Sequence, residues 1–176
     1  MNILMALSQL EVTGAEVYAT TVGNELTRRG HQVFYVSDTL TKPTLGPVFR
    51  LRFNKRSILR RFWHVFYLIY LIRKHRIQLV HAHSRASGWS SYVACKLTGT
   101  PMITTVHGRQ PVHASRKAFH ALGYRAVAVC EDIASQIIDN LGVDPAMVQV
   151  LRNGIETDKF QPVPIPDNDK PVIAII

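Results

Sequence analysis

The sequence predicts an α/β protein with a doubly wound, mainly parallel β-sheet. Short apolar runs alternate along the chain with longer amphipathic segments, which is the pattern of strands connected by helices. The chain has 176 residues, of which 47% are hydrophobic and 19% charged. This length and composition suit one globular domain with a core of its own.

The individual elements follow from local patterns. Residues 2–7 form an almost wholly apolar run, which we expect to be the first, buried strand. Gly30 stands where the C-terminal cap of a first helix belongs, and before it apolar residues recur at helical spacing: Ala15, Tyr18, Ala19, Val22 and Leu26. Pro, Gly and Thr residues over 39–47 predict a loop. Further strands are expected over residues 31–37, 48–53, 78–83, 102–106, 126–130 and 148–151. Further helices are expected over residues 55–76, 86–97, 115–122 and 133–141.

The composition also restricts location and chemistry. The first residues have no basic stretch of the kind that opens a signal peptide, and no run reaches the ~18 apolar residues that a spanning helix requires. Cys95 and Cys130 are the two cysteines, and their spacing does not suit a metal site. We therefore expect reduced thiols and a cytoplasmic protein.

The net charge of +9 is concentrated in one part of the chain. Residues 39–130 contain no Asp or Glu, yet they hold 16 of the 21 Lys and Arg residues. Such asymmetry indicates an anionic partner: membrane lipid, a phosphorylated substrate or nucleic acid.

Thr13-Gly14-Ala15-Glu16 joins the first strand to the first helix. Gly14 lets a ligand approach the backbone closely, and a helix start offers free N–H groups and the positive end of the helix dipole. This predicts an anion site suited to a phosphate. A plain strand-to-helix turn capped by Thr13 or Gly14 explains the same residues equally well.

Two histidines close the strand expected over 78–83. His81 and His83 are two positions apart, so on a strand they share a face. Two imidazoles could bind zinc, but no third ligand is evident nearby and the surrounding window supplies no carboxylate, so a metal site is the minority interpretation. We expect His81 to be a buried structural histidine and His83, nearer the strand end, to face the ligand crevice.

A third histidine, His107, follows the strand expected over 102–106 and precedes Gly108. In a doubly wound sheet this position points into the ligand crevice. An imidazole there can hydrogen-bond a hydroxyl group or accept a proton near neutral pH. A structural histidine at the strand end is the alternative. A pair of catalytic carboxylates is hard to build, because Glu131 and Asp132 suit the first turn of a helix better.

The helix expected over 55–76 is basic and rich in aromatic residues, with no acidic residue. Apolar residues surround it, so we expect one face to pack on the sheet and another to stay exposed. A helix of this kind can lie in a membrane interface, and exposure of Trp63, Phe66 or Tyr70 would favour that interpretation over an ordinary core helix. Nucleic acid is disfavoured, because we find no nucleic-acid motif.

Four segments, in order along the chain, resemble the N-terminal domain of family 4 glycosyltransferases, which have the GT-B fold. Gly14-Ala15-Glu16 is similar to a Gly-Gly-Ala-Glu loop, with Thr13 in place of the first glycine. The segment from Gln78 to His83 resembles D-[VI]-[VI]-H-x-H, with Gln78 in place of the aspartate.

The other two segments lie further along. Thr105-Val106-His107-Gly108 resembles T-x-H-[DG]. Residues 152–160, which contain Asn153 and Gly154, resemble P-N-G-[VI]-[DE]-x-x-x-F, the turn that closes the domain. A Pro-rich spacer and the apolar run 172–176 follow this turn.

The resemblance implies a Rossmann-like N-terminal half of a GT-B fold and a retaining transfer of a sugar from a nucleotide sugar to an acceptor hydroxyl, with no required metal or other cofactor. It places Gly14, Ala15 and Glu16 at the donor diphosphate and His107 at the reacting sugar. The residues expected on the acceptor side of the cleft are His83, Arg85, Gly108 and Arg109.

Domain organisation and acceptor follow from the same resemblance. Residues 1–161 are expected to form the acceptor-binding domain, and 162–176 a linker and the first strand of a C-terminal nucleotide-sugar-binding domain. The chain on its own is then expected to be inactive. Charge favours an anionic or lipid-linked acceptor such as a lipopolysaccharide core or another envelope glycan, at the inner face of the plasma membrane.

Two other functions stay open. The first is a membrane-associated binding module without catalysis, which the basic aromatic helix would serve. The second is a GT-B epimerase that acts on a nucleotide sugar. An epimerase predicts a carboxylate-rich cleft, and the acid-free window of residues 39–130 argues against one.

Overall fold

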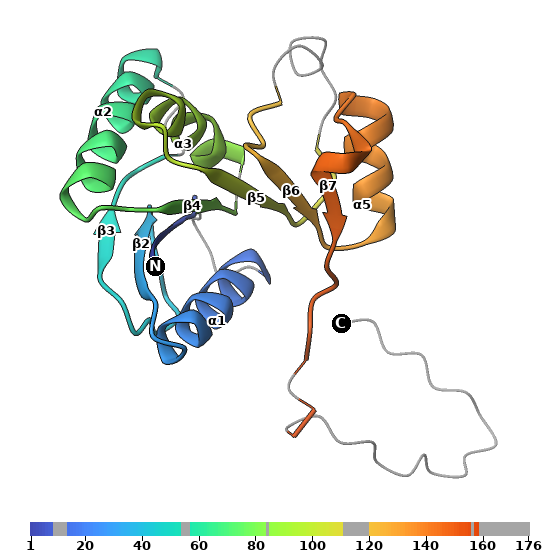
Figure 1. Cartoon of the computed structure of the whole chain (residues 1–176), viewed down its shortest axis with the longest axis horizontal. Helices are drawn as coiled ribbons and strands as arrows, with labels where there is room; N and C mark the ends of the chain where they lie inside the picture. Colours follow the sequence, from blue (N-terminus) through green and yellow to red (C-terminus); the bar gives the residue numbers. More distant parts are fainter. Residues whose placement is uncertain (9–13, 54–56, 84, 111–119, 156, 159–176) are drawn as a thin grey trace.

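A computed structural model describes residues 1–8, 14–53, 57–83, 85–110, 120–155 and 157–158, and these form a single parallel sheet with helices on both faces (Figure 1). The seven strands in this part of the chain pair in the order β3-β2-β1-β4-β5-β6-β7, and every pairing is parallel. The strands are β1 (Asn2–Ala6), β2 (Gln32–Ser37), β3 (Val48–Arg50), β4 (Leu79–Ala82), β5 (Met102–Val106), β6 (Arg125–Ala128) and β7 (Val148–Val150). The predicted doubly wound α/β fold is confirmed.

The helices fall close to their predicted places. They are α1 (Gly14–Arg28), α2 (Ile58–Lys74), α3 (Arg85–Thr98) and α5 (Glu131–Ser135), which continues as the π-helical turn η1 (Gln136–Asn140), and the short 3-10 turn η2 (Pro145–Met147). Of the helix predicted over 115–122, residues 115–119 lie outside the described residues, and His120–Leu122 are not helical. The predicted linker and strand over 162–176 also lie outside them.

Two helix ends show how the chain turns back into the sheet. Gly30 has a φ of +86° just after α1, and the N–H of His31 bonds to the carbonyl of Leu26, so the predicted glycine cap is confirmed. Arg76 holds the equivalent place after α2 with a φ of +50°, and the N–H of Ile77 bonds to the carbonyl of Ile72. Since left-handed backbone is unfavourable for residues with a Cβ, this second cap carries no sequence signal.

Side chains of β1 alternate between two cores. Ile3 and Met5 pack with Ala19 of α1 on one face of the sheet. Leu4 and Ala6 pack with α2 and α3 on the other face. Both faces of the central strands are therefore covered, which is why these strands are continuous apolar runs in the sequence.

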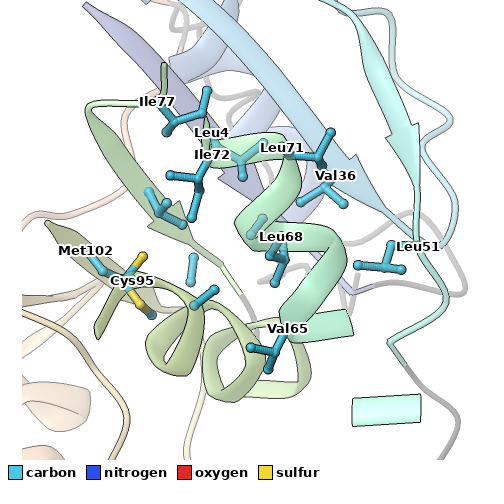
Figure 2. Close-up of a cluster of buried hydrophobic side chains, with 14 of the residues drawn as sticks. Leu4, Val36, Leu51, Val65, Leu68, Leu71, Ile72, Ile77, Cys95 and Met102 are labelled. Carbon is cyan, nitrogen blue, oxygen red and sulfur yellow. The ribbon is translucent and has the colours of Figure 1, made fainter. Parts of the chain in front are cut away.

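Helix α2 buries one of its faces against the sheet. Figure 2 shows Leu71 of this helix beside Leu4 and Val36 of the strands, and Val65 and Leu68 belong to the same buried cluster. The opposite face is exposed, as the sequence predicted, and it carries Leu59, Phe62, Trp63, Phe66 and Tyr70. None of the helices in the described part of the chain is long and apolar enough to cross a membrane.

Candidate functional site

Most of the predicted site residues lie at or just after the carboxyl ends of β1, β4 and β5, which are neighbours in the sheet. The chain leaves β1 toward one edge of the sheet and leaves β4 toward the other, so the point where the strand order reverses lies between them. Ligands of doubly wound sheets bind at this point. Gly14 begins the helix that follows β1, and Arg85 begins the helix that follows β4.

His107 lies half-buried at the end of β5. Its ring meets the edge of the Tyr18 ring, with centroids 5.1 Å apart and planes at 70°, and its Nε2 lies 3.4 Å from Nδ1 of His83. Burial lowers the pKa of the His107 imidazole to about 4. The ring is therefore neutral at pH 7, with one nitrogen that donates a hydrogen bond and one that accepts.

His83 lies beneath His107 and not at the open crevice where we expected it. Its side chain is only 3% exposed, because β1 and α1 cover it: its Nε2 is 3.5 Å from Sδ of Met5, and its ring centroid is 5.8 Å from that of Tyr18. Burial, with the nearby His81 and His107, holds the pKa of His83 well below its usual range. His83 is thus placed to orient His107 and is too buried to contact a ligand directly.

His81 is the buried structural histidine that the sequence predicted. It is 7% exposed, and its Nε2 lies 2.8 Å from Oγ1 of Thr105 on the neighbouring strand. Burial lowers the pKa of His81 to about 4. Within the residues that the structure describes, no group of three or more His, Cys, Asp or Glu side chains could hold a metal ion.

Gly14 and Glu16 differ in their surroundings. Gly14 is exposed, and apart from its chain neighbours and the backbone of its own helix, no atom of the described residues lies within 4 Å of the position that a Cβ would take. Glu16 is 1% exposed, and its Oε1 accepts hydrogen bonds from the Thr41 amide at 2.6 Å, the Thr41 hydroxyl at 2.9 Å and the Lys42 amide at 2.8 Å. Two residues correspond to about 200° around a helix, so Glu16 points away from Gly14. Its expected place in a donor loop is therefore corrected: Glu16 anchors the 39–47 loop.

The expected acceptor-side residues other than His83 are exposed. Arg85 and Gly108 lie at the surface, and within the described part of the chain no atom other than those of its neighbours approaches the Cβ position of Gly108 within 4 Å. Arg109 forms a two-pronged ion pair with Asp132 in the first turn of α5, where its Nε donates to Oδ2 at 2.9 Å. The pair is solvent-exposed, and such pairs contribute only about 0–1 kcal/mol, so an anionic ligand can replace the carboxylate.

Asn153 and Gly154 lie apart from the histidines. Both are exposed and follow β7, which is at the sheet edge, two strands away from β5. Ala15, by contrast, is half-buried in the first turn of α1. The structure therefore brings together Gly14, Tyr18, His83 and His107, and leaves the 152–154 turn outside this group.

Tyr18 is the main site residue that the sequence did not indicate. Its place in the apolar repeat of α1 indicated a core position, but its half-buried ring packs against the rings of His83 and His107. Its position four residues after Gly14, one helical turn further along, is the signal that could have found it.

A family model described as Glycosyltransferase Family 4 matches residues 12–159, which contain every residue of this site. The chain belongs to this family. The match agrees with the resemblance that the four ordered segments carry, and it makes the strand-end crevice part of a glycosyltransferase domain.

Named relatives support the same class. The chain is 28% identical over 104 residues to the UDP-Gal:alpha-D-GlcNAc-diphosphoundecaprenol alpha-1,3-galactosyltransferase of Escherichia coli, a match over 52% of this chain and 27% of that protein. Among solved structures, a glycosyltransferase from Rickettsia africae has a TM-score of 0.79 at 25% identity over 89% of this chain and 44% of its own. The lipopolysaccharide outer core galactosyltransferase WaaB has a TM-score of 0.74 at 18% identity, over 97% and 50%.

The match thus covers about half of each solved chain and about a quarter of the curated relative. The fold alone does not define the reaction, since the UDP-N-acetylglucosamine 2-epimerase from Rickettsia bellii also superposes, with a TM-score of 0.62 at 12% identity.

Proposed function

We propose that this chain is the acceptor-binding half of a retaining glycosyltransferase that moves a hexose from a nucleotide sugar to an acceptor hydroxyl. The observation that carries the proposal is the neutral His107 at the carboxyl end of β5, packed against Tyr18 and His83 next to the open start of α1. A neutral imidazole can orient a sugar hydroxyl without placing a second positive charge beside a developing oxocarbenium ion.

The donor is a UDP-sugar in this proposal, as it is for the Escherichia coli relative. The diphosphate lies at the N-terminus of α1, where Gly14 leaves room for it and the helix dipole favours negative charge. Ala15 contributes its backbone at the same place. In this proposal no metal is required, because the N-terminus of α1 offers the diphosphate free N–H groups and the positive end of the helix dipole.

The acceptor is an anionic or lipid-linked glycan, in envelope or lipopolysaccharide synthesis at the cytoplasmic face of the membrane. Arg85 and Arg109 supply the positive charge on the acceptor side of the crevice, Arg109 after it exchanges Asp132 for the acceptor anion. The named relative acts on a diphosphoundecaprenol-linked sugar, which is an acceptor of this class.

An assay of the intact protein separates this proposal from its rivals. The protein is incubated with UDP-sugars, with and without a polyprenyl-diphosphate-linked sugar, and free UDP, new glycan and epimerised donor are measured. We expect UDP release and glycan growth that both depend on the acceptor. Epimerised donor without acceptor would indicate an epimerase, and no turnover with any donor would favour a binding module. Residues 1–176 alone are expected to show no transfer.

A further inference from the structure

The exposed face of α2 carries a row of large apolar side chains. Its members lie at i, i+3, i+4, i+7 and i+11, so they form one stripe along the helix, and each side chain is 51–82% exposed. The stripe, called the α2 stripe below, consists of Leu59, Phe62, Trp63, Phe66 and Tyr70. An aliphatic and four aromatic side chains exposed in a row mark an interaction site.

Folding does not explain the α2 stripe. Val65, Leu68, Leu71 and Ile72 fill the core from the opposite side of the same helix, and they are 1–4% exposed. The side chains of the stripe point away from this core, and the sheet is covered by the other face of the helix. Its exposed rings are therefore available to a partner.

Cations flank the stripe. Arg60, Arg73 and Lys74 of α2 are exposed, and Nζ of Lys74 donates a hydrogen bond to the Tyr70 hydroxyl at 2.8 Å, which raises the pKa of Lys74. Neither α2 nor α3 contains an acidic residue, since none occurs between Thr39 and Cys130. A partner for this face must be both apolar and negatively charged.

We propose that the α2 stripe is a docking surface for an anionic lipid bilayer, with the aromatic rings inserted at headgroup level and Arg60, Arg73 and Lys74 on lipid phosphates. A bilayer supplies apolar depth and negative charge on one surface. A second copy of this chain does not, because a two-fold interface through the stripe would bring the same cations of both copies together.

The geometry relates this surface to the crevice. Helix α2 follows β3 and precedes β4. Its first turns, with Leu59, Phe62 and Trp63, therefore lie on the side of the sheet where the carboxyl ends of the parallel strands are. His107 follows the carboxyl end of β5 and so lies on the same side. A docked α2 therefore brings the crevice close to the lipid headgroups, where a lipid-linked acceptor is found. This last step rests on the proposed function, whereas lipid docking does not.

Vesicle flotation tests the docking. The protein is mixed with vesicles of phosphatidylcholine alone or with roughly a third phosphatidylglycerol, which gives the surface its negative potential. We expect the wild type to float with the anionic vesicles. The Trp63→Ser/Phe66→Ser variant should lose about tenfold or more in affinity, because it lacks two rings that docking would bury in the lipid. The matched control is Leu97→Ser/Tyr124→Ser, which removes two exposed apolar side chains elsewhere and should float like the wild type.

Tryptophan fluorescence provides the second readout. Trp63 and Trp89 are the two tryptophans, and Trp89 is half-buried against the α2–α3 core. We expect a blue shift and quenching by brominated lipids in the wild type, and neither in Trp63→Phe, which keeps an apolar ring for docking. Equal binding to neutral vesicles, or a Trp63 shift that follows protein concentration without lipid, would overturn the inference. Failure of the wild type to float with anionic vesicles, while it still transfers sugar to a water-soluble acceptor, would overturn the docking and leave the proposed function standing.

Discussion

Glu16 is a buried carboxylate whose partners come from a loop 25 residues away. Removing it leaves the amides of Thr41 and Lys42 without their carboxylate acceptor, and hydrogen bonds to a charged group contribute about 1.5–3 kcal/mol. We therefore expect Glu16→Ala to lower the free energy of unfolding in urea by that amount. Glu25→Ala on the same helix removes only exposed ion pairs and should change it by less than about 1 kcal/mol. Equal effects of the two substitutions would contradict the anchoring role.

The buried histidines make stability depend on pH. In the folded protein the pKa values of His81 and His107 are about 4, whereas unfolded histidine titrates near 6.5. Between these values the unfolded chain binds more protons, so the free energy of unfolding falls as the pH is lowered from about 6.5 toward 4, by about 1.4 kcal/mol per pH unit for each such group.

Urea unfolding at several pH values measures this slope. His81→Gln removes one titrating group. The slope of its unfolding free energy against pH should therefore be smaller than that of the wild type by about 1.4 kcal/mol per pH unit in this window. The slope is the readout, because the lost contact with Thr105 shifts stability at every pH. An unchanged slope would mean that His81 is already protonated in the folded protein.

At the scale of elements, α1 is held close to β2 by the absence of a side chain at Gly23. A Cβ at this position would clash with the Tyr35 phenol, which is fully buried and donates a hydrogen bond to Asn24. Gly→Ala in a helix normally stabilises by about 1 kcal/mol. Here we expect the opposite sign, a loss of about 1–3 kcal/mol from overpacking, measured by thermal or urea unfolding. The loss should be smaller when Gly23→Ala is combined with Tyr35→Phe, which removes the clashing oxygen.

The two faces of α2 predict opposite results for neighbouring positions. Leu68 is buried against the sheet, so Leu68→Ala should lower the free energy of unfolding by about 2–5 kcal/mol. Phe66→Ser, two residues earlier and 65% exposed, should change it by less than about 0.5 kcal/mol. A large loss for Phe66→Ser would show that the α2 stripe is part of the fold and would remove the basis for lipid docking.

Most helices and strands could be predicted from the sequence, because the pattern that indicates each of them is local. The apolar runs of the seven strands, the helical repeat after Gly14 and the cap at Gly30 are all contained in a few consecutive residues. The cap at Arg76 was not predictable, because surrounding structure imposes its left-handed backbone on a residue that does not favour it.

The site was predictable only in part. Strand-end positions of His83 and His107 follow from the pattern of runs, but which histidine is buried depends on how α1 crosses the sheet. Glu16 was assigned to a ligand because its true partners, in the 39–47 loop, are distant in sequence. Tyr18 was taken for a core residue for the same reason: helical spacing shows that a face is apolar and does not show what it meets.

For the whole molecule, the carboxyl ends of the neighbouring strands β1, β4 and β5 lie together on one side of the sheet. The family match makes this sheet part of a glycosyltransferase domain. Two separate surfaces follow from it. We propose sugar transfer at Gly14 and His107 and membrane contact at the α2 stripe. Because no residue belongs to both, substitutions can remove one activity and leave the other.

The central claim is that His107 faces the reacting sugar. The most direct measurement is kcat/KM for sugar transfer by the intact protein with His107→Ala, beside its free energy of unfolding. We predict a loss of about 10²-fold or more in kcat/KM, since the transition state loses a positioned hydrogen-bonding group, while the protein stays folded. Full transfer activity in folded His107→Ala would contradict the account.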